Sequence, residues 1–156
     1  MSLLFYEGTN FWKTPTEYKP GVKLSKDTLF EVERLLGVRL PASYLKLMDV
    51  QNGGELRFRY VLFEDGDAAV VPYFYEIDIE HGIGLSSVFI EECGLPEGVV
   101  LLTGDLHSWV ALDYRKTKEP SVVYITESES GDGTWEEYQL ASTFDEFTTR
   151  LFKKDD

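Results

Sequence analysis

Apolar residues recur at helical spacing in two neighbouring stretches near the start of the chain. The first follows Ser25, a residue type that caps helix N-termini, and stops at Gly37, which tolerates the left-handed backbone that closes a helix. A corner at Leu40-Pro41 opens a second helical stretch, which stops at Asn52-Gly53-Gly54. The pattern therefore predicts two consecutive helices joined by a sharp bend.

From residue 55 onward the period changes to two, which is typical of strands. Alternation predicts a strand over residues 55–63, with an apolar face made of Leu56, Phe58, Tyr60 and Leu62. Further short strands are predicted at residues 69–74, 99–102, 109–114, 121–125 and 135–138. Residues 75–85 follow neither period, and residues 126–134 form an acidic loop without core-forming side chains.

Two more helices are predicted in the second half of the chain. A short helix begins at Ser86 or Ser87 and runs through Glu92. A last helix begins at Thr143, which has capping-box spacing to Glu146, and its inner face consists of Phe144, Phe147 and Leu151. The connections between strands are mostly too short for parallel crossovers. We therefore predict an α+β fold, a single domain over residues 1–156 with a mostly antiparallel sheet and helices packed on one side.

Charge is unevenly distributed along the chain. The formal net charge is −13, yet residues 1–59 carry a net +2 and residues 60–156 a net −15. No Lys or Arg occurs between Arg59 and Arg115, an interval that holds 11 carboxylates. Phosphate binding requires cations, so this balance disfavours a nucleic-acid or membrane partner and favours a basic protein partner. An acidic surface that only keeps the protein soluble is the alternative.

The cellular location is suggested by cysteine usage and hydropathy. The single cysteine, Cys93, excludes an intrachain disulfide and suits a reducing compartment. The first residues lack the basic flank and apolar run of a signal peptide. The longest nearly apolar run, residues 68–75, is far shorter than the roughly 20 residues that span a bilayer. These features predict a cytoplasmic protein.

Candidate catalytic and metal-binding groups are few. Asp105, His107 and Asp113 are candidate metal ligands, and His81 with Glu80 is the alternative catalytic group, although a turn-forming role for Asp105 is the favoured interpretation. The Gly-x-Gly sequence at residues 82–84 lacks the third glycine of a dinucleotide loop, and the Ser-x-x-Lys sequence at residues 43–46 lacks its companion motifs. We therefore predict no enzyme activity, no cofactor and no metal.

Several sequence blocks, taken in order, resemble the Smi–Knr family, also called the SUKH superfamily. The blocks are Leu36-Gly37-Val38-Arg39-Leu40-Pro41-Ala42-Ser43-Tyr44, Gln51-Asn52-Gly53-Gly54, Gly94-Leu95-Pro96, Leu101-Leu102-Thr103-Gly104-Asp105, Trp109-Val110-Ala111-Leu112-Asp113-Tyr114-Arg115, Glu119-Pro120-Ser121-Val122 and Phe144-Asp145-Glu146-Phe147. Each block alone is weak, but their combination is specific and covers roughly residues 12–152. The resemblance is strongest to the Gram-positive bacterial branch.

The resemblance implies an α+β bacterial immunity protein that binds and neutralises a polymorphic toxin, in many members a nuclease, by occlusion and without catalysis. The alternative that it implies is a non-catalytic scaffold or regulatory protein-binding module, as in the eukaryotic cell-wall regulators. The family has no established catalytic residues to carry over. The matching positions look structural, among them Gly37, Pro41, Gly104 and Trp109.

Two regions offer carboxylates to a basic partner. The preferred region combines acidic and aromatic side chains, which supply charge complementarity and buried area: Glu64, Asp65, Asp67, Tyr73, Tyr75, Glu76, Asp78 and Glu80. The second region surrounds the acidic loop: Glu127, Glu129, Asp132, Glu136 and Glu137. For residues 73–80, simple alternation between the core and solvent faces of a strand is the competing explanation.

Overall fold

The computed structural model describes residues 3–18, 20–63 and 65–154. In this part of the chain the helices are α1 (Lys26–Leu36), α2 (Ala42–Val50), α3 (Ser86–Cys93) and α4 (Phe144–Thr149), with a 3₁₀ turn η1 (Ile83–Leu85) before α3. None of these described helices has the length and apolar character that crossing a bilayer requires.

The local helix signals act as predicted. The Ser25 hydroxyl accepts a hydrogen bond from the Thr28 amide at 3.1 Å, and α1 ends at Gly37, whose φ is 71°. Thr143 caps α4 in the same way, through the Glu146 amide at 3.1 Å. These hydrogen bonds satisfy amides of the first turn that have no partner within the helix, so both starts are fixed locally.

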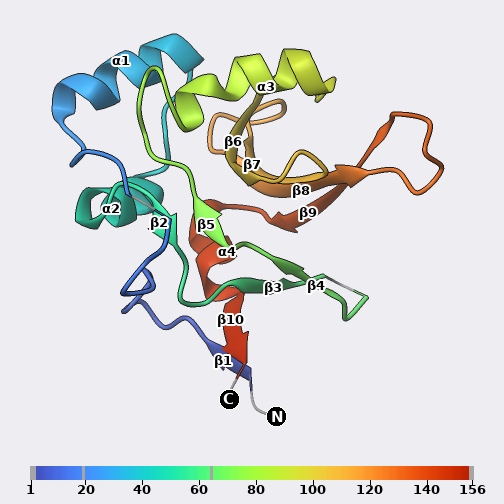
Figure 1. The fold of residues 1–156 in the computed structure, drawn as a ribbon, viewed down its shortest axis with the longest axis horizontal. Coiled ribbons are helices and arrows are strands. Elements are labelled where there is room, and N and C mark those ends of the chain that lie inside the picture. Colours follow the sequence, from blue (N-terminus) through green and yellow to red (C-terminus); the bar gives the residue numbers. More distant parts are fainter. Residues whose placement is uncertain (1–2, 19, 64, 155–156) are drawn as a thin grey trace.

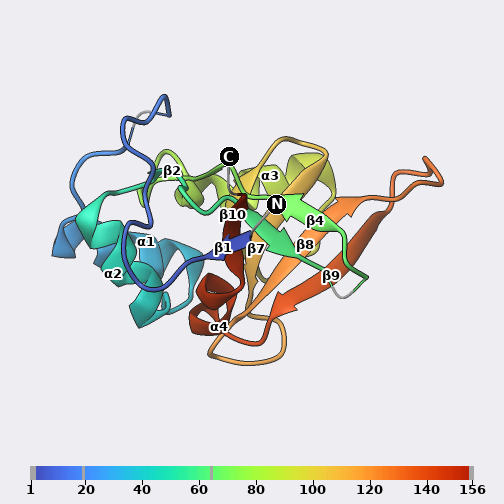
Figure 2. The same ribbon diagram turned by 90° about the horizontal axis from the view of Figure 1, so that it is seen from below.

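The strands form three antiparallel sheets (Figure 1, Figure 2). One has the order β1-β10-β3-β4, a second pairs β2 with β5, and the third has the order β6-β7-β8-β9. Their bounds are β1 (Leu3–Phe5), β2 (Gly54–Glu55), β3 (Tyr60–Leu62), β4 (Ala68–Val70), β5 (Tyr73–Phe74), β6 (Val99–Gly104), β7 (Ser108–Asp113), β8 (Ser121–Glu127), β9 (Trp135–Ala141) and β10 (Leu151–Lys154). The predicted α+β class and antiparallel pairing are confirmed.

In the β6–β9 sheet, β6, β7 and β8 are largely buried on both faces, whereas residues 136–139 of the edge strand β9 are exposed. Val110 of β7 lies in the larger core, together with Phe144 of α4, whereas its neighbour Trp109 lies in a smaller core, against Phe89 of α3. Figure 1 shows α3 above this sheet and α4 below it. The helices therefore do not pack on a single side as predicted, because this sheet is apolar on both faces and each face needs a cover.

The predicted strand over residues 55–63 is divided between two sheets. β2 pairs with β5, whereas β3 pairs with β4 and β10. Between them Leu56 forms a single bridge with Trp12, and the Arg57 amide donates to the Phe11 carbonyl at 2.9 Å. Trp12 is buried and donates its indole N–H to the Leu47 carbonyl at 3.1 Å. The N-terminal arm thus takes the place of a neighbouring strand and is tied to α2.

The last helix is shorter than the sequence pattern predicts. α4 ends at Thr149, and Leu151 is the first residue of β10, where it pairs with Val61 of β3. The Leu151 side chain is still fully buried in the larger core. The burial was therefore predicted correctly and the secondary structure wrongly, because an apolar residue after a helix can be buried by a strand equally well.

Asn52 joins three segments of the chain. Its side-chain amide donates to the carbonyls of Val22 and Ile77 at 2.8 and 3.1 Å, and its side-chain oxygen accepts from the Ile77 amide at 2.8 Å. Its backbone carbonyl accepts from the Gly21 amide at 2.8 Å. Asn52 is 4% exposed, so these hydrogen bonds replace the hydrogen bonds to water that its amide group loses on burial. The stop after α2 therefore also positions the segments around residues 21 and 77.

Candidate functional site

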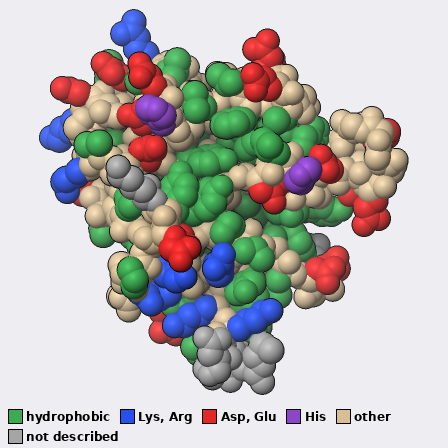
Figure 3. Space-filling view, viewed as in Figure 1, with side chains coloured by type: hydrophobic (Ala, Val, Ile, Leu, Met, Phe, Trp, Pro, Cys, Tyr) green, Lys and Arg blue, Asp and Glu red, His purple; other side chains and the backbone are tan. Residues whose placement is uncertain are grey.

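The predicted partner-binding residues lie on three parts of the fold. Glu64 lies outside the described residues. The others belong to the β3–β4 turn, to β5 and to the loop that leads to η1: Asp65, Asp67, Tyr73, Tyr75, Glu76, Asp78 and Glu80. Figure 3 shows carboxylates gathered over the first and the last of these parts, with hydrophobic surface between them. The structure therefore does not bring the acids into one cluster.

The tyrosines belong to a series of packed rings. Tyr18 stacks on Tyr73 with centroids 4.4 Å apart, Tyr73 lies 5.8 Å from Tyr75, and Tyr75 lies parallel to Phe89 at 6.5 Å. The hydroxyls of Tyr73 and Tyr75 both donate to the Gly104 carbonyl at 3.2 Å. Burial raises the pKa of Tyr75, so its hydroxyl remains a donor. The half-buried rings are thus held rigidly while part of each ring stays exposed.

Asp65 and Asp67 are exposed at the tip of the β3–β4 turn, where the Asp65 carboxylate accepts from the Asp67 amide at 2.9 Å. Phe63, at the base of the turn, packs on Tyr138 of β9 with centroids 5.7 Å apart. A hydrogen bond to Glu136 raises the pKa of Tyr138, and the charge of Asp65 adds to this effect. The two aspartates therefore lie beside the second predicted acidic region.

Glu76, Asp78 and Glu80 shape the loop before η1. Glu76 is half-buried and lies close to Gly21. A Cβ atom added at Gly21 would lie only 2.2 Å from Glu76 Oε2. The Asp78 carboxylate accepts from the Glu80 amide at 3.0 Å and lies 3.1 Å from His81 Nδ1. Asp78 therefore holds the loop in shape, Glu76 packs beside Gly21, and Glu80 is the most accessible of the three described side chains.

The β6–β7 turn adds a residue that the sequence does not reveal. Leu106 has a φ of 78°, a left-handed conformation that side chains other than Gly seldom adopt, and it is 57% exposed. Asp105 fixes the turn by accepting from two of its backbone amides at 2.9 and 2.8 Å. Gly104, the last residue of β6 before this turn, accepts hydrogen bonds from the hydroxyls of Tyr73 and Tyr75 through its carbonyl. The sequence predicts the turn, but no local signal marks an apolar residue with a positive φ.

The candidate metal ligands do not meet. The length of β7 separates His107 from Asp113, and these six residue steps correspond to about 20 Å along an extended strand. His107 Nδ1 lies instead 3.2 Å from Glu127 Oε2 on the exposed side of the turn. In residues 3–18, 20–63 and 65–154, no group of three or more His, Cys, Asp or Glu side chains is placed to hold a metal ion.

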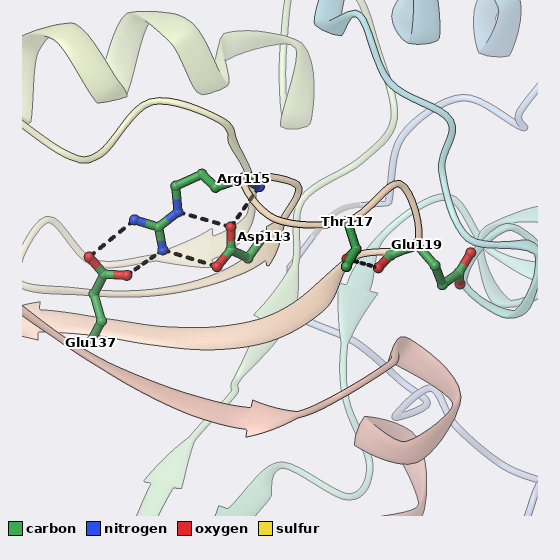
Figure 4. A network of polar contacts seen from close by, with 5 residues as sticks. All are labelled: Asp113, Arg115, Thr117, Glu119 and Glu137. Atoms are coloured by element: carbon green, nitrogen blue, oxygen red, sulfur yellow. Dashed lines mark hydrogen bonds and ion pairs between the residues drawn. The ribbon is translucent and has the colours of Figure 1, made fainter.

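Asp113 belongs to an ion-pair network with Arg115 and Glu137 (Figure 4). Arg115 Nε lies 2.9 Å from Asp113 Oδ1, Arg115 Nη2 lies 3.0 Å from Oδ2, and the same guanidinium bonds Glu137 on β9. These hydrogen bonds hold the pKa of Asp113 below its usual value and raise the pKa of Arg115. Because Asp113 is 8% exposed, the network cross-links β7 and β9 and leaves its carboxylate little access to a ligand.

A rigid, partly exposed aromatic surface on an α+β fold is typical of a protein-binding domain. The family model described as SMI1-KNR4 cell-wall matches residues 26–148. The chain therefore belongs to the Smi–Knr (SUKH) superfamily, as its sequence blocks predict. Members of this superfamily are generally non-catalytic immunity or binding proteins. No curated protein matched the chain in a sequence comparison.

Proposed function

We propose that this protein is an immunity protein that binds a basic toxin domain and neutralises it by covering its surface. The observation that carries the proposal is the aromatic face, defined as Tyr18, Tyr73, Tyr75 and Leu106, whose side chains are partly exposed on rigid supports. Membership of the SUKH superfamily is consistent with an immunity role. The protein performs no chemistry of its own in this proposal.

The aromatic face has the physical properties of a binding anchor. Tyrosine rings bury a large area while losing the freedom of few torsions, and anchors that are already immobile lose little entropy on binding. The hydroxyls of Tyr73 and Tyr75 are engaged by Gly104, so the ring surfaces are what a partner meets. Leu106 adds an apolar side chain that projects from the neighbouring turn.

Carboxylates lie on both sides of the aromatic face. The β3–β4 turn, which carries the exposed Asp65 and Asp67, lies on one side of it, and the loop before η1, which carries Asp78 and Glu80, lies on the other (Figure 1, Figure 3). Such an arrangement attracts and orients a basic partner before contact is made. We place this encounter in the cytoplasm, since Cys93 is free and suits a reducing compartment.

Co-purification with the C-terminal toxin domain encoded beside this gene tests the proposal. Leu106→Asn keeps a residue type that tolerates left-handed backbone but removes the apolar contact, so the Kd should rise at least about tenfold. Val50→Asn is the matched control, because Val50 is an exposed apolar residue on α2 outside the aromatic face. Its Kd should equal that of the wild type.

Two outcomes would contradict the proposal. Equal affinity of the Leu106→Asn variant and the wild type would exclude the aromatic face as the binding surface. Absence of a neighbouring toxin gene, together with capture of cell-wall regulators, would favour the scaffold function that the description of the family model suggests.

A further inference from the structure

The surface is hollowed near the C-terminal end of β7, at the opposite end of this strand from Leu106. A groove of about 1100 Å³ runs between the C-terminal turn of α1, residues 37–39 and the β7–β8 connection. Tyr114 links two of its walls, since its hydroxyl donates to the Arg39 carbonyl at 2.6 Å. None of the residues of the aromatic face lines the groove, and Leu106 lies on the β6–β7 turn at the other end of β7, so the groove and the aromatic face are separate surfaces.

The groove is positively charged in a chain whose net charge is −13. Four exposed cations line it, and none of them forms an ion pair with another described side chain: Arg34, Arg39, Lys116 and Lys118. Arg115 also lines the groove but is bound to Asp113 and Glu137. The carboxylate of Glu33 accepts from the Leu40 amide at 2.7 Å, and the charge of Glu119 acts on Tyr114 nearby. The cations therefore outnumber the acids around this groove.

The groove continues into a hollow of about 610 Å³ between α1 and α3, whose lining is mainly apolar but includes the exposed residues Glu91 and Glu97. Leu36, Val38 and Gly98 line both hollows, so the two are contiguous. On α1, Phe30 and Leu35 border them with side chains that are 67% and 52% exposed. One continuous surface therefore presents cations at one end and apolar side chains at the other.

We propose that this continuous groove binds an acidic segment of a partner protein. Asp or Glu side chains of the segment lie at the cation-lined end, and its apolar side chains lie in the hollow between α1 and α3. Charge complementarity selects the occupant, because the four cations form no ion pair within the described chain and outnumber the carboxylates that line this end. This inference is independent of the toxin-binding proposal and gives the protein a second, oppositely charged binding surface.

A peptide fits this surface better than a nucleic acid does. The apolar half of the groove offers nothing to a phosphate backbone, whereas it can bury the aliphatic side chains of a peptide. The remaining surface carries most of the 28 Asp and Glu residues and would repel an extended polyanion. A short segment can keep its Asp or Glu side chains at the cation-lined end, away from Glu91 and Glu97 of the second hollow.

Fluorescence anisotropy with a labelled peptide tests the proposal. The probe is a short peptide with Glu in its first half and Leu in its second half, and the comparison peptide has Gln in place of every Glu. The Glu peptide should bind, and the Gln peptide should bind at least about tenfold more weakly. Lys116→Glu with Lys118→Glu should weaken binding of the Glu peptide by a similar factor.

The matched control is Lys23→Glu with Lys46→Glu, which changes the net charge equally at exposed positions outside the groove. It should leave the affinity unchanged, and circular dichroism should show both double variants folded. Equal binding of the Glu and Gln peptides, or no binding of the Glu peptide, would overturn the proposal. The proposal would also be overturned if a single-stranded oligonucleotide bound more tightly than the Glu peptide. Self-association of the wild type that disappears in the Lys116→Glu, Lys118→Glu variant would overturn it too, because the occupant of the groove would then be a second copy of this chain.

Discussion

Leu106 is an apolar side chain held on left-handed backbone at the tip of a turn. A non-glycine residue in this conformation costs about 1 kcal/mol, and the exposed side chain regains little of it by packing. Such a cost is tolerated where the side chain has a use, and contact with a partner is the use that we propose.

Replacing Leu106 by Gly separates these two effects. Leu106→Gly should leave the free energy of unfolding unchanged or raise it by up to about 1 kcal/mol, because Gly adopts a φ of 78° without strain. Binding to the toxin domain should weaken at the same time. Urea denaturation and a binding titration on one sample measure both, and a less stable variant would contradict the assignment of strain.

Asp113 makes stability depend on pH in the acid range. Its pKa in the folded protein is lowered by Arg115, so the folded state binds fewer protons there than the unfolded state does. The stabilisation is present above the unfolded pKa of about 3.9 and is lost as the pH falls through the lower, folded value. The ion pair of Asp113 therefore stabilises the folded protein at neutral pH and ceases to do so in strong acid, because the pKa of Asp113 is lowered on folding.

We therefore expect Asp113→Asn to lower the free energy of unfolding at neutral pH by on the order of 2 kcal/mol. The difference from the wild type should shrink as the pH falls below about 4. Asp49→Asn, on the exposed side of α2, is the control for the loss of one charge. Chemical denaturation at a series of pH values measures the difference, and a difference that stays constant would exclude the ion pair as its cause.

Single residues are predictable from sequence where their role is local. Ser25 and Thr143 accept hydrogen bonds from amides three residues away, the Gly37 amide donates to the Glu33 carbonyl, and these helix signals were predicted correctly. Asn52 is read from sequence as a helix stop, yet its side chain bonds Val22 and Ile77, which only the fold brings together. Leu106 was missed for the same reason, because its backbone conformation is set by the turn around it.

At the scale of elements, periodicity predicts burial better than it predicts pairing. Residues 55–63 alternate as one strand would, but the N-terminal arm at Trp12 interrupts them and divides their partners between two sheets. Leu151 is buried as predicted, although in β10 instead of α4. The terminal strands β1 and β10 each need the other as a partner, and the pattern of either segment alone does not indicate that pairing.

The β6–β7 hairpin depends on the close approach of Gly104 to Trp109. A Cβ at Gly104 would lie 2.0 Å from Trp109 Cε3, and the indole is 1% exposed and has no room to move away. Gly104→Ala should therefore cost about 2–3 kcal/mol of unfolding free energy and should also weaken toxin binding, because the turn carries Leu106.

Gly66→Ala is the comparison for this prediction. Gly66 has a φ of 93° and open space around it, so its substitution should cost only about 1 kcal/mol, through backbone conformation alone. Thermal or urea unfolding of both variants measures the two costs. A Gly104→Ala variant no less stable than the Gly66→Ala variant would contradict the close packing.

At the scale of the whole molecule, composition predicts the sign of the charge but not its arrangement. The predicted acidic residues lie partly on the β3–β4 turn and partly on the loop before η1. Asp65 is close enough to Tyr138 of β9 for its charge to affect the Tyr138 pKa, although the two residues are far apart in the sequence. Arg34 and Lys118 are distant in sequence and line one groove. The candidate binding site stays a prediction, and the separation of its acidic residues into two places could not be foreseen from the sequence.

Electrostatic attraction should govern how fast the toxin domain associates. The association rate should fall markedly as salt rises from about 0.05 to 0.5 M, because screening shortens the reach of the acidic surface. Asp65→Lys with Asp67→Lys should slow association more than it speeds dissociation, since both residues lie beyond the edge of the aromatic face. Stopped-flow kinetics measure both rates, and a salt-independent association rate would contradict steering.

The position of Asn52 before Gly53 has a chemical consequence. Asparagine before glycine readily loses ammonia, because the glycine amide nitrogen can attack the side-chain carbonyl. Here the Gly53 amide donates to the Gln51 carbonyl at 2.9 Å, and the Asn52 side chain is bonded on both of its polar atoms. Deamidation would require this segment to open first. The rate at which isoaspartate accumulates at position 52, measured by mass spectrometry, should therefore report how often this segment unfolds locally.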